Sequence, residues 1–293
     1  FIRRSAMRKQ KYGHKIWILC MTLATLVMIT PIIMMVTTSF KTMEEIKSPV
    51  FHLLPEKFSF VNYIDALNGA NWVIYFRNSV FITLAAVLFS ILFNSISGFA
   101  FARLKFKGSK VLFMFILIGL MMPPQVTMLP TFLIMAKFPL AGGNDLLGAG
   151  GTGLINSFAG LIIPLVSGSY GIFLCKQFYE NFPKSLDEAA EIDGCNKWRT
   201  YFTIYLPNSK AIIATLGLTK SVAVWNDYMW PLIMTNSDGM KTVQLALTMF
   251  KSDGYILWNQ LMAASVIVVI PMVIIFLCAQ KYFVQGIVTS GLK

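Results

Sequence analysis

The sequence predicts an all-α polytopic membrane protein with six transmembrane helices, and its composition and the pattern of its apolar segments lead to that fold class. Hydrophobic residues make up 56% of the 293 residues, and charged residues make up only 13%. An ordinary soluble domain carries about 25% charged residues. The apolar residues gather in long segments, and most basic residues lie in alternate connections between them. A chain of this kind is expected to fold in a bilayer rather than around a soluble core.

Six segments have the length that a transmembrane helix needs, about 20 residues for a hydrocarbon core of about 30 Å. They cover roughly residues 16–38, 78–102, 111–136, 155–175, 211–230 and 257–280. The first segment is too long for the apolar part of a cleavable signal peptide. Prolines inside the segments, among them Pro123, Pro124 and Pro271, predict a kinked bundle around a cavity. Because no internal repeat or second domain is visible, we expect a single transmembrane domain over residues 1–293.

The basic residues predict the orientation of the chain. Seventeen of the 25 Lys and Arg residues fall in the N-terminal tail, the connections after the second and fourth segments, and the C-terminal tail. Since cytoplasmic connections carry an excess of Lys and Arg, both termini and residues 181–207 are expected to be cytoplasmic. The net charge of +12 therefore reflects topology. Nucleic-acid binding is not expected, because no basic patch is interleaved with stacking aromatics.

The connection at residues 181–207 holds the most informative motif of the chain. It reads Glu188-Ala189-Ala190, then Gly194 after three residues, then Ile204, Leu206 and Pro207 at fixed spacing. Ser185 and Glu188 have the spacing of a capping box, and Gly194 lies where a helix commonly ends in a left-handed turn. We expect one helix over about 186–193 and a second over about 197–205. Two short helices joined by a glycine bend would form a stiff, L-shaped element.

This pattern resembles E-A-A-x3-G-x9-I-x-L-P, the cytoplasmic-loop signature of permease subunits of ABC importers. Several other runs resemble one branch of that superfamily, the sugar permeases of the maltose-transporter type. They are Asn78-Ser79, residues 99–108, Met122-Pro123-Pro124-Gln125, residues 171–174, residues 225–232 and residues 262–265. The chain is thus identified as a binding-protein-dependent transport inner-membrane component, a permease subunit of a carbohydrate ABC importer. Inner permeases for peptides or phosphate share the loop but are not expected to show this combination.

The resemblance implies an assembly in which this chain is not an enzyme. No G-x-x-x-x-G-K-[ST] occurs, so ATP and Mg²⁺ are expected on two separate ATPase subunits, and this chain is expected to bind no cofactor. The other implied partners are a second, different permease subunit, an extracytoplasmic sugar-binding protein and the lipid bilayer of the inner (cytoplasmic) membrane. The resemblance also implies that the C-terminus, around 285–293, can reach the ATPase. The residues implied to dock on the ATPase are Glu188, Ala189, Ala190, Glu191, Asp193, Gly194, Leu206 and Pro207.

The fifth segment supplies the candidate substrate pathway. Sugars are bound by aromatic faces and hydrogen-bonding side chains, and the candidates of these types are Thr219, Lys220, Trp225, Asn226, Asp227 and Tyr228. The aromatic residues could instead be interfacial anchors, and Asn226 and Asp227 could simply end the helix. Lys220 departs from the family pattern, and a mid-span lysine should face a cavity, pair with Asp227 or extend to the interface. If Lys220 lines the pore, an acidic sugar becomes more plausible as a substrate than it would otherwise be.

The sequence does not predict nucleotide binding or metal binding by this chain. The glycine run 148–153 fits G-x-G-x-x-G but follows no strand, and the four cysteines and two histidines have no metal-ligand spacing. Three alternatives remain open at this point. One is an ABC permease for a solute other than sugar, and another is an integral membrane enzyme, which would need a charged catalytic cluster. The third is a secondary transporter, which would normally show an inverted repeat.

Overall fold

The computed structural model describes residues 2–252 and 254–290, and the side chains of residues 14–252 and 254–280. The C-terminal contact expected around 285–293 therefore lies outside the described side chains. The chain forms two compact units, residues 1–70 with 247–269 and residues 71–246 with 270–293, and the single transmembrane domain over residues 1–293 stays a prediction. Each unit is described by itself.

The first unit contains the N-terminal apolar helix and the segments that follow it. Its elements are α1 (Ile2–Thr38), α2 (Met43–Lys47), α3 (Val61–Asn68), η5 (Leu247–Phe250), β1 (Lys251–Ser252), β2 (Tyr255–Ile256) and the start of α14 (Trp258–Ser290). The two strands pair antiparallel. Asn62 joins three parts of this unit, because its amide nitrogen donates to the carbonyls of Ser39 and Lys41, both at 2.8 Å, and its amide oxygen accepts from Asn259 at 2.7 Å.

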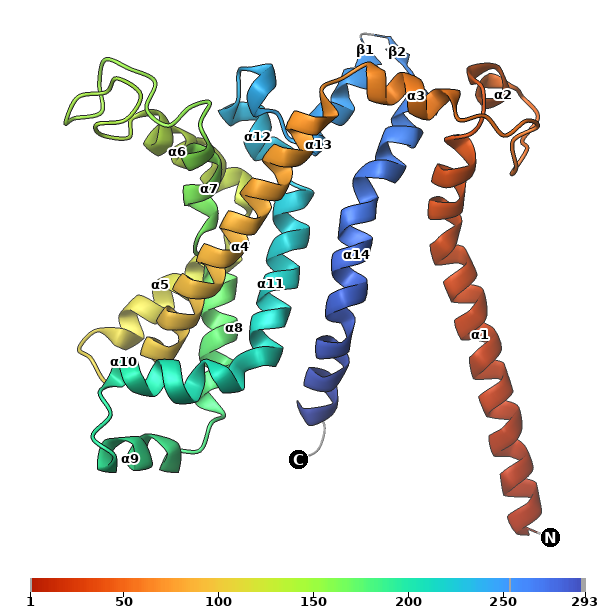
Figure 1. The fold of residues 1–293 in the computed structure, drawn as a ribbon. Coiled ribbons are helices and arrows are strands. Elements are labelled where there is room, and N and C mark those ends of the chain that lie inside the picture. Colours follow the sequence, from red (N-terminus) through yellow and green to blue (C-terminus); the bar gives the residue numbers. More distant parts are fainter. Residues whose placement is uncertain (1, 253, 291–293) are drawn as a thin grey trace. The chain divides into compact units, whose positions relative to one another are not determined.

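The second unit contains one long helix and the shorter helices that follow it along the chain (Figure 1). Its elements are α4 (Trp72–Arg103), α5 (Ser109–Met121), α6 (Pro124–Ala136), α7 (Phe158–Ile162), η1 (Ile163–Leu165), α8 (Ser169–Glu180), α9 (Ser185–Ile192), α10 (Lys197–Thr200), η2 (Tyr201–Tyr205), η3 (Pro207–Ser209), α11 (Lys210–Trp225), α12 (Met229–Met234), η4 (Asp238–Met240), α13 (Val243–Ala246) and the rest of α14. Helices α8 and α11 both pack along α4.

One face of α4 is polar although it is buried. The residues on it are Asn78, Ser79, Thr83, Ser90, Asn94 and Ser95, each less than 5% exposed. Asn78 donates to the carbonyls of Gly239 and Lys241, and Asn94 accepts from the backbone N–H of Gly168 at 3.0 Å. Polar side chains in membrane helices commonly join neighbouring elements in this way, because an unpaired polar group in a bilayer is costly.

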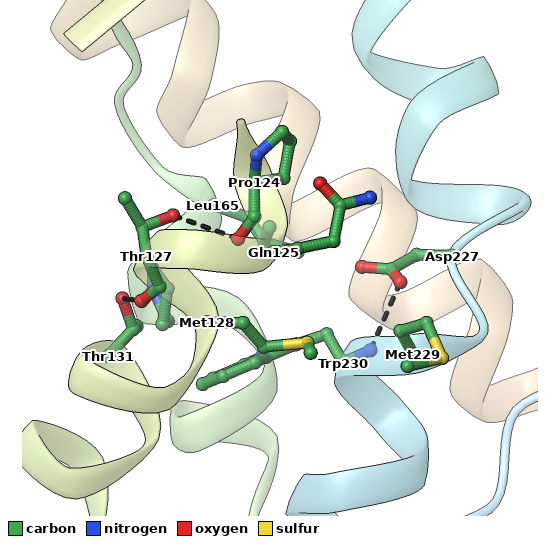
Figure 2. Close-up of a pocket in the computed structure, with 10 residues that line it drawn as sticks. Pro124, Gln125, Thr127, Met128, Thr131, Leu165, Asp227, Met229 and Trp230 are labelled. Atoms are coloured by element: carbon green, nitrogen blue, oxygen red, sulfur yellow. Dashed lines mark hydrogen bonds between the residues drawn. The ribbon is translucent and has the colours of Figure 1, made fainter. Parts of the chain in front are cut away.

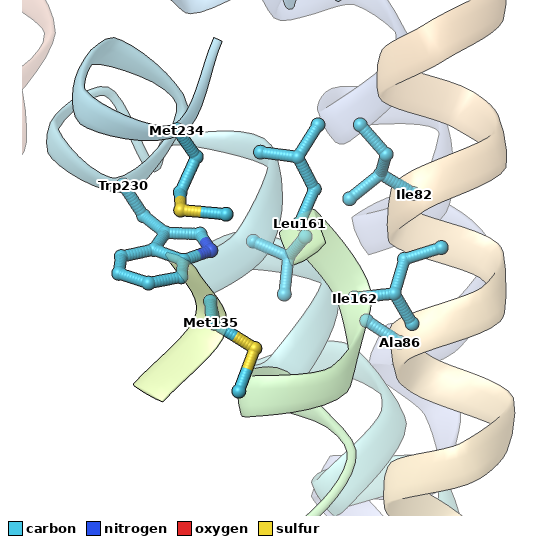
Figure 3. Packing of buried hydrophobic residues seen from close by; sticks show 8 residues of the cluster. Ile82, Ala86, Met135, Leu161, Ile162, Trp230 and Met234 are labelled. Carbon is cyan, nitrogen blue, oxygen red and sulfur yellow. The ribbon is translucent and has the colours of Figure 1, made fainter. Parts of the chain in front are cut away.

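An apolar cluster lies between the N-terminal half of α4 and the shorter helices that pack on it (Figure 3). Its buried members are Ile82, Ala86, Met135, Leu161, Ile162, Val224, Trp230 and Met234. The indole nitrogen of Trp230 donates to the carbonyl of Gly160 at 3.2 Å, which satisfies its polar edge inside the cluster. This cluster fixes α6, α7 and α12 against the long helix.

Length and composition identify three unbroken helices able to cross a membrane among the described residues, or up to five spans if two bent pairs each count as one. The unbroken ones are His14–Thr38, α4 and Trp258–Gln280. Helices α5 and α6 form a bent pair at 110°, and Phe158–Leu165 with α8 form another at 41°. The first bend lies at Met122–Pro123, where Met122 is extended because a residue before proline is disfavoured in the helical region.

The fifth predicted segment, 211–230, is not one helix. Helix α11 has 16 residues and ends at Trp225, and α12 begins only at Met229. The prediction of a continuous helix to Trp230 was wrong because polar side chains at 226 and 227 take up backbone groups at the break. Asn226 donates to the carbonyl of Val222 at 3.0 Å, and Asp227 accepts from the N–H of Trp230 at 3.2 Å.

We expect Gly98→Ala to destabilise the second unit, because its new methyl group would lie 2.4 Å from Cβ of Cys175 and 2.8 Å from the backbone nitrogen of Lys176. Overpacking of this kind costs about 1–3 kcal/mol. The measurement is the thermal unfolding midpoint of the purified protein in detergent, followed by tryptophan fluorescence.

The matched control is Gly217→Ala in α11, where the nearest atoms would lie at 3.5 and 3.8 Å, ordinary contact distances. Its midpoint should stay the same or rise, since alanine favours a helix over glycine. Equal midpoints for the two variants would contradict the close packing of α4 on α8.

Candidate functional site

The predicted helix of the E-A-A loop is α9, Ser185–Ile192, which confirms the expected bounds to within one residue. The predicted capping box at Ser185 was wrong. Ser185 is already helical and Lys184 takes the cap position, where no side chain makes a capping hydrogen bond. The acidic side chains Asp187 and Glu188 lie in the first turn instead, where their negative charge interacts favourably with the positive end of the helix dipole.

The glycine bend has the geometry that the sequence predicted. Gly194 has a φ of +69°, in the left-handed region. Its N–H donates to the carbonyl of Glu191 at 3.1 Å, and the N–H of Cys195 donates to the carbonyl of Ala190 at 2.8 Å. These two bonds form a Schellman motif, which satisfies the last carbonyls of α9.

A second helical stretch follows the bend, as expected. Asn196 caps it by accepting from the N–H of Arg199 at 2.8 Å. The stretch is α10, then the π-helical turn η2, which together cover Lys197–Tyr205. Figure 1 shows α9 and α10 at the same end of the second unit as the end of α4.

The predicted docking residues differ in exposure. Those that are exposed are Glu188, Ala189, Glu191, Asp193, Gly194 and Pro207. Ala190 is only 2% exposed, and Leu206 packs partly buried against the core beside Tyr205, so both support the loop from within. Lys197 forms an ion pair with Glu191, and this hydrogen bond lowers the pKa of Glu191 below its usual value.

Two apolar features of the loop escaped sequence reasoning. Ile192, the last residue of α9, is 86% exposed, and Trp198 is 62% exposed. Trp198 stacks on Phe202, with ring centroids 6.4 Å apart. The sequence did carry one signal of this, because Ile192 is an apolar residue among four acidic ones. A helix that only faces solvent has no need of an apolar residue at that position.

A pocket of about 610 Å³ lies where the broken helices meet (Figure 2). Its lining residues are Pro124, Gln125, Thr127, Met128, Thr131, Pro164, Leu165, Asp227, Met229 and Trp230. Among the described residues that line the pocket, Asp227 is the only ionisable one. Figure 2 shows its carboxylate on the side of the pocket opposite the α6 threonines. Met128, Leu165 and Trp230 make the wall apolar.

Of the predicted pathway residues, only Asp227 lines this pocket. Trp225 is buried and contacts Phe76, with centroids 6.2 Å apart, and Asn226 is exposed and accepts from Gln244 at 3.1 Å. The hydroxyl of Thr219 donates to the carbonyl of Thr215 in its own helix.

Tyr228 and Lys220 are half-buried and do not line the pocket. Within the described side chains, no ion pair joins Lys220 to Asp227, so the expected alternative of a salt bridge is not seen. Sequence reasoning missed Gln125, Thr127 and Thr131, although the run Met122-Pro123-Pro124-Gln125 had marked the break that places them.

Comparison with known proteins identifies the class. The chain matches the model of the "Binding-protein-dependent transport system inner membrane component" family over residues 94–289 and belongs to that family. It is therefore a permease subunit of an ABC importer, a transport subunit of the inner membrane. This membership sets aside the integral membrane enzyme and the secondary transporter.

Relatives with known assignments cover nearly the whole chain. The arabinooligosaccharides transport system permease protein AraQ of Halalkalibacterium halodurans is 30% identical, over 94% of this chain and 96% of the relative. The probable starch degradation products transport system permease protein AmyC of Thermoanaerobacterium thermosulfurigenes is 30% identical over 92% and 93%. The sn-glycerol-3-phosphate transport system permease protein UgpE of Brucella suis is 30% identical over 95% of each chain.

Solved structures support the same fold. A chain of a bacterial ABC transporter involved in the import of the acidic polysaccharide alginate matches with a TM-score of 0.79 and 22% identity, over 94% of this chain and 98% of that chain. A chain of the alginate transporter in complex with an alginate pentasaccharide-bound periplasmic protein matches with a TM-score of 0.67 and 13% identity, over 90% and 92%. At these identities the likeness concerns the fold alone.

We expect Gly194→Ala to loosen the end of α9, because a side chain in the left-handed region costs about 1–2 kcal/mol. Backbone amides of α9 should then exchange with deuterium about 5–30 times faster, the factor that corresponds to this energy. The measurement is hydrogen–deuterium exchange of the purified protein, read by mass spectrometry.

Gly239→Ala is the control, since Gly239 lies in η4 with no neighbour within 4 Å and no positive φ. Exchange in α9 should be unchanged in that variant. If Gly194→Ala left α9 as protected as in the parent protein, the bend would not depend on the left-handed glycine.

Proposed function

We propose that this chain is one of two different permease subunits of a carbohydrate importer, driven by two separate ATPase subunits that dock on α9. The observation that carries the proposal is the exposed elbow of α9, Gly194 and α10. Its acidic surface and the protruding Ile192 offer a partner both charge and an apolar anchor. Its hydrogen-bonded bend makes it stiff enough to transmit a displacement.

The basic residues support an orientation with both termini and residues 181–207 in the cytoplasm. ATP and Mg²⁺ would then be bound by the ATPase subunits, and no cofactor by this chain. The family description supports an extracytoplasmic binding protein that delivers the solute. In this assembly, closure of the ATPases would move α9 and open the pathway toward the binding protein.

We propose a neutral carbohydrate as the solute. The pocket offers a carboxylate and the side-chain amide of Gln125 as hydrogen-bonding groups against apolar walls, an arrangement that suits a hydroxyl-rich molecule. Because the one charged group among the described lining residues is a carboxylate, the pocket disfavours an anion, since like charges brought together cost several kcal/mol. The names of the relatives AraQ and AmyC refer to oligosaccharide and starch products, which supports this class.

An anionic solute is the second candidate. The relative UgpE carries the name of an sn-glycerol-3-phosphate permease, and Lys220 is the one basic residue inside the predicted segment 211–230. Uptake by the reconstituted importer from panels of neutral sugars, uronic acids and phosphorylated polyols separates the two candidates. Uptake restricted to the anions would overturn the neutral assignment.

We expect Ile192→Glu to abolish most association with the ATPase subunits, because a buried carboxylate would replace the apolar anchor. The measurement is the amount of ATPase that co-purifies with tagged permease. Leu147→Glu is the matched control, since Leu147 is 90% exposed in the connection predicted to lie outside. Equal co-purification of both variants and the parent would refute docking through the tip of α9.

We expect Asp227→Asn to lower uptake of the neutral sugar about ten- to a hundredfold, since a hydrogen bond to a charged group contributes about 1.5–3 kcal/mol. The measurement is the initial uptake rate in proteoliposomes at a fixed ATP concentration. Lys220→Met removes a charge that does not line the pocket and should keep most of the parent's rate. Loss of uptake in Lys220→Met alone would favour the anionic solute.

A further inference from the structure

The guanidinium of Arg103, the last residue of α4, contacts two other elements of the second unit. Its Nε and Nη2 donate to the carbonyl of Tyr179 at 3.1 and 2.7 Å, and Nη2 also donates to the carbonyl of Phe182. Its Nη1 donates to Oδ2 of Asp187, in the first turn of α9, at 3.2 Å. The Arg103 side chain is only 8% exposed, so these bonds are shielded from water.

The carboxylate of Asp187 is held from a second side. Its Oδ1 accepts from the hydroxyl of Tyr205 at 2.7 Å, and the ring of Tyr205 lies 5.4 Å from Cζ of Arg103. Burial, together with the hydrogen bond to Asp187, raises the pKa of Tyr205 well above its usual value, so the hydroxyl keeps its proton and remains a donor. Arg103, Asp187 and Tyr205 thus form a closed triangle, called the clamp below.

The clamp rests on a packed aromatic base. The ring of Tyr205 lies 5.0 Å from that of Phe182 and 4.8 Å from that of Phe99, and Tyr205 itself is fully buried. Phe99 belongs to α4, one turn before Arg103. The base therefore fixes Tyr205 against α4 and the end of α8, and α9 cannot shift against α4 without breaking the bond between Asp187 and the buried Arg103.

We propose that Arg103 is a positioning residue that transmits the displacement of α9 directly to α4 and to the end of α8, which couples solute transport to ATP hydrolysis. The inference rests on the proposed docking of ATPases on α9. Asp187 is 84 residues away from Arg103 along the chain, yet the Arg103 side chain connects α4 directly to α9 by donating to the Asp187 carboxylate. The fork of the guanidinium is essential, because a lysine ammonium cannot serve two carbonyls and a carboxylate in one plane.

The test is Arg103→Lys in the complete importer, with both permeases, the ATPases and the binding protein, in proteoliposomes. The readout is the number of solute molecules imported per ATP hydrolysed, alongside co-purification of the ATPases. We expect the complex to assemble as in the parent and this ratio to fall about tenfold, because α9 moves without α4. A parental ratio in Arg103→Lys would overturn the proposal.

Two further variants make the outcome specific. Lys105→Gln removes a neighbouring charge that lines the same surface cavity but forms no hydrogen bond or ion pair within the described side chains, and it should keep the parental ratio. Tyr205→Phe keeps the ring but removes the donor to Asp187, and it should lower the ratio in the same direction. In the double variant the two losses should not add, because both residues act on one carboxylate.

If the complex with Arg103→Lys fails to assemble, the Tyr205→Phe variant tests the proposal in its place. A parental ratio of solute imported per ATP hydrolysed in Tyr205→Phe would then overturn the proposed role of the clamp. Failure of the docking proposal has a different signature. In that case Ile192→Glu would still bind the ATPases and stay coupled. Coupling lost in Ile192→Glu but kept in both clamp variants would reject the clamp alone.

Discussion

The second unit depends on hydrogen bonds from the buried polar face of α4. Near the N-terminal end of α4, Asn78 donates to the carbonyls of Gly239, in η4, and of Lys241. Farther along, Asn94 holds the start of α8, and Ser95 bonds the hydroxyls of Tyr179 and Tyr201. Each such bond contributes only about 0.6 kcal/mol in a membrane protein. Their importance lies in position, because they fix where each shorter element meets the long helix.

The pocket exists because helices around α4 are broken. The proline pair at 123–124 turns α6 away from α5, and Asn226 and Asp227 separate α11 from α12. Breaks in membrane helices are tolerated where the freed backbone groups are satisfied or line a cavity. Here the side chain of Asp227 satisfies one N–H and still faces the pocket, so the break that ends α11 also supplies the polar group of the site.

The sequence alone could predict the helical class, the bounds of α9 and the left-handed Gly194, since each rests on local rules of composition and spacing. It could not place the cap of α9, because Ser185 and Lys184 compete for one position within a single turn. It also missed Gln125 and Thr131, since their approach to Asp227 depends on a bend between α5 and α6. Likewise the sequence placed Arg103 in the family-like run 99–108 and among the charges that set orientation, but it could not reveal its hydrogen-bond partners, which lie 76–84 residues away.

Helix α4 joins the two candidate sites through one rigid element. Ser79 and Thr83 of α4 line a small cavity together with Asp227, while Arg103 holds the first turn of α9. Between Thr83 and Arg103 the helix is continuous, and at 1.5 Å per residue these positions are about 30 Å apart. A straight helix of this length transmits a shift at one end to the other, provided that both ends are fixed to their neighbours. If one movement of α4 serves both sites, the effects of variants at Arg103 and Asp227 on transport are expected to be non-additive, although the two residues lie far apart.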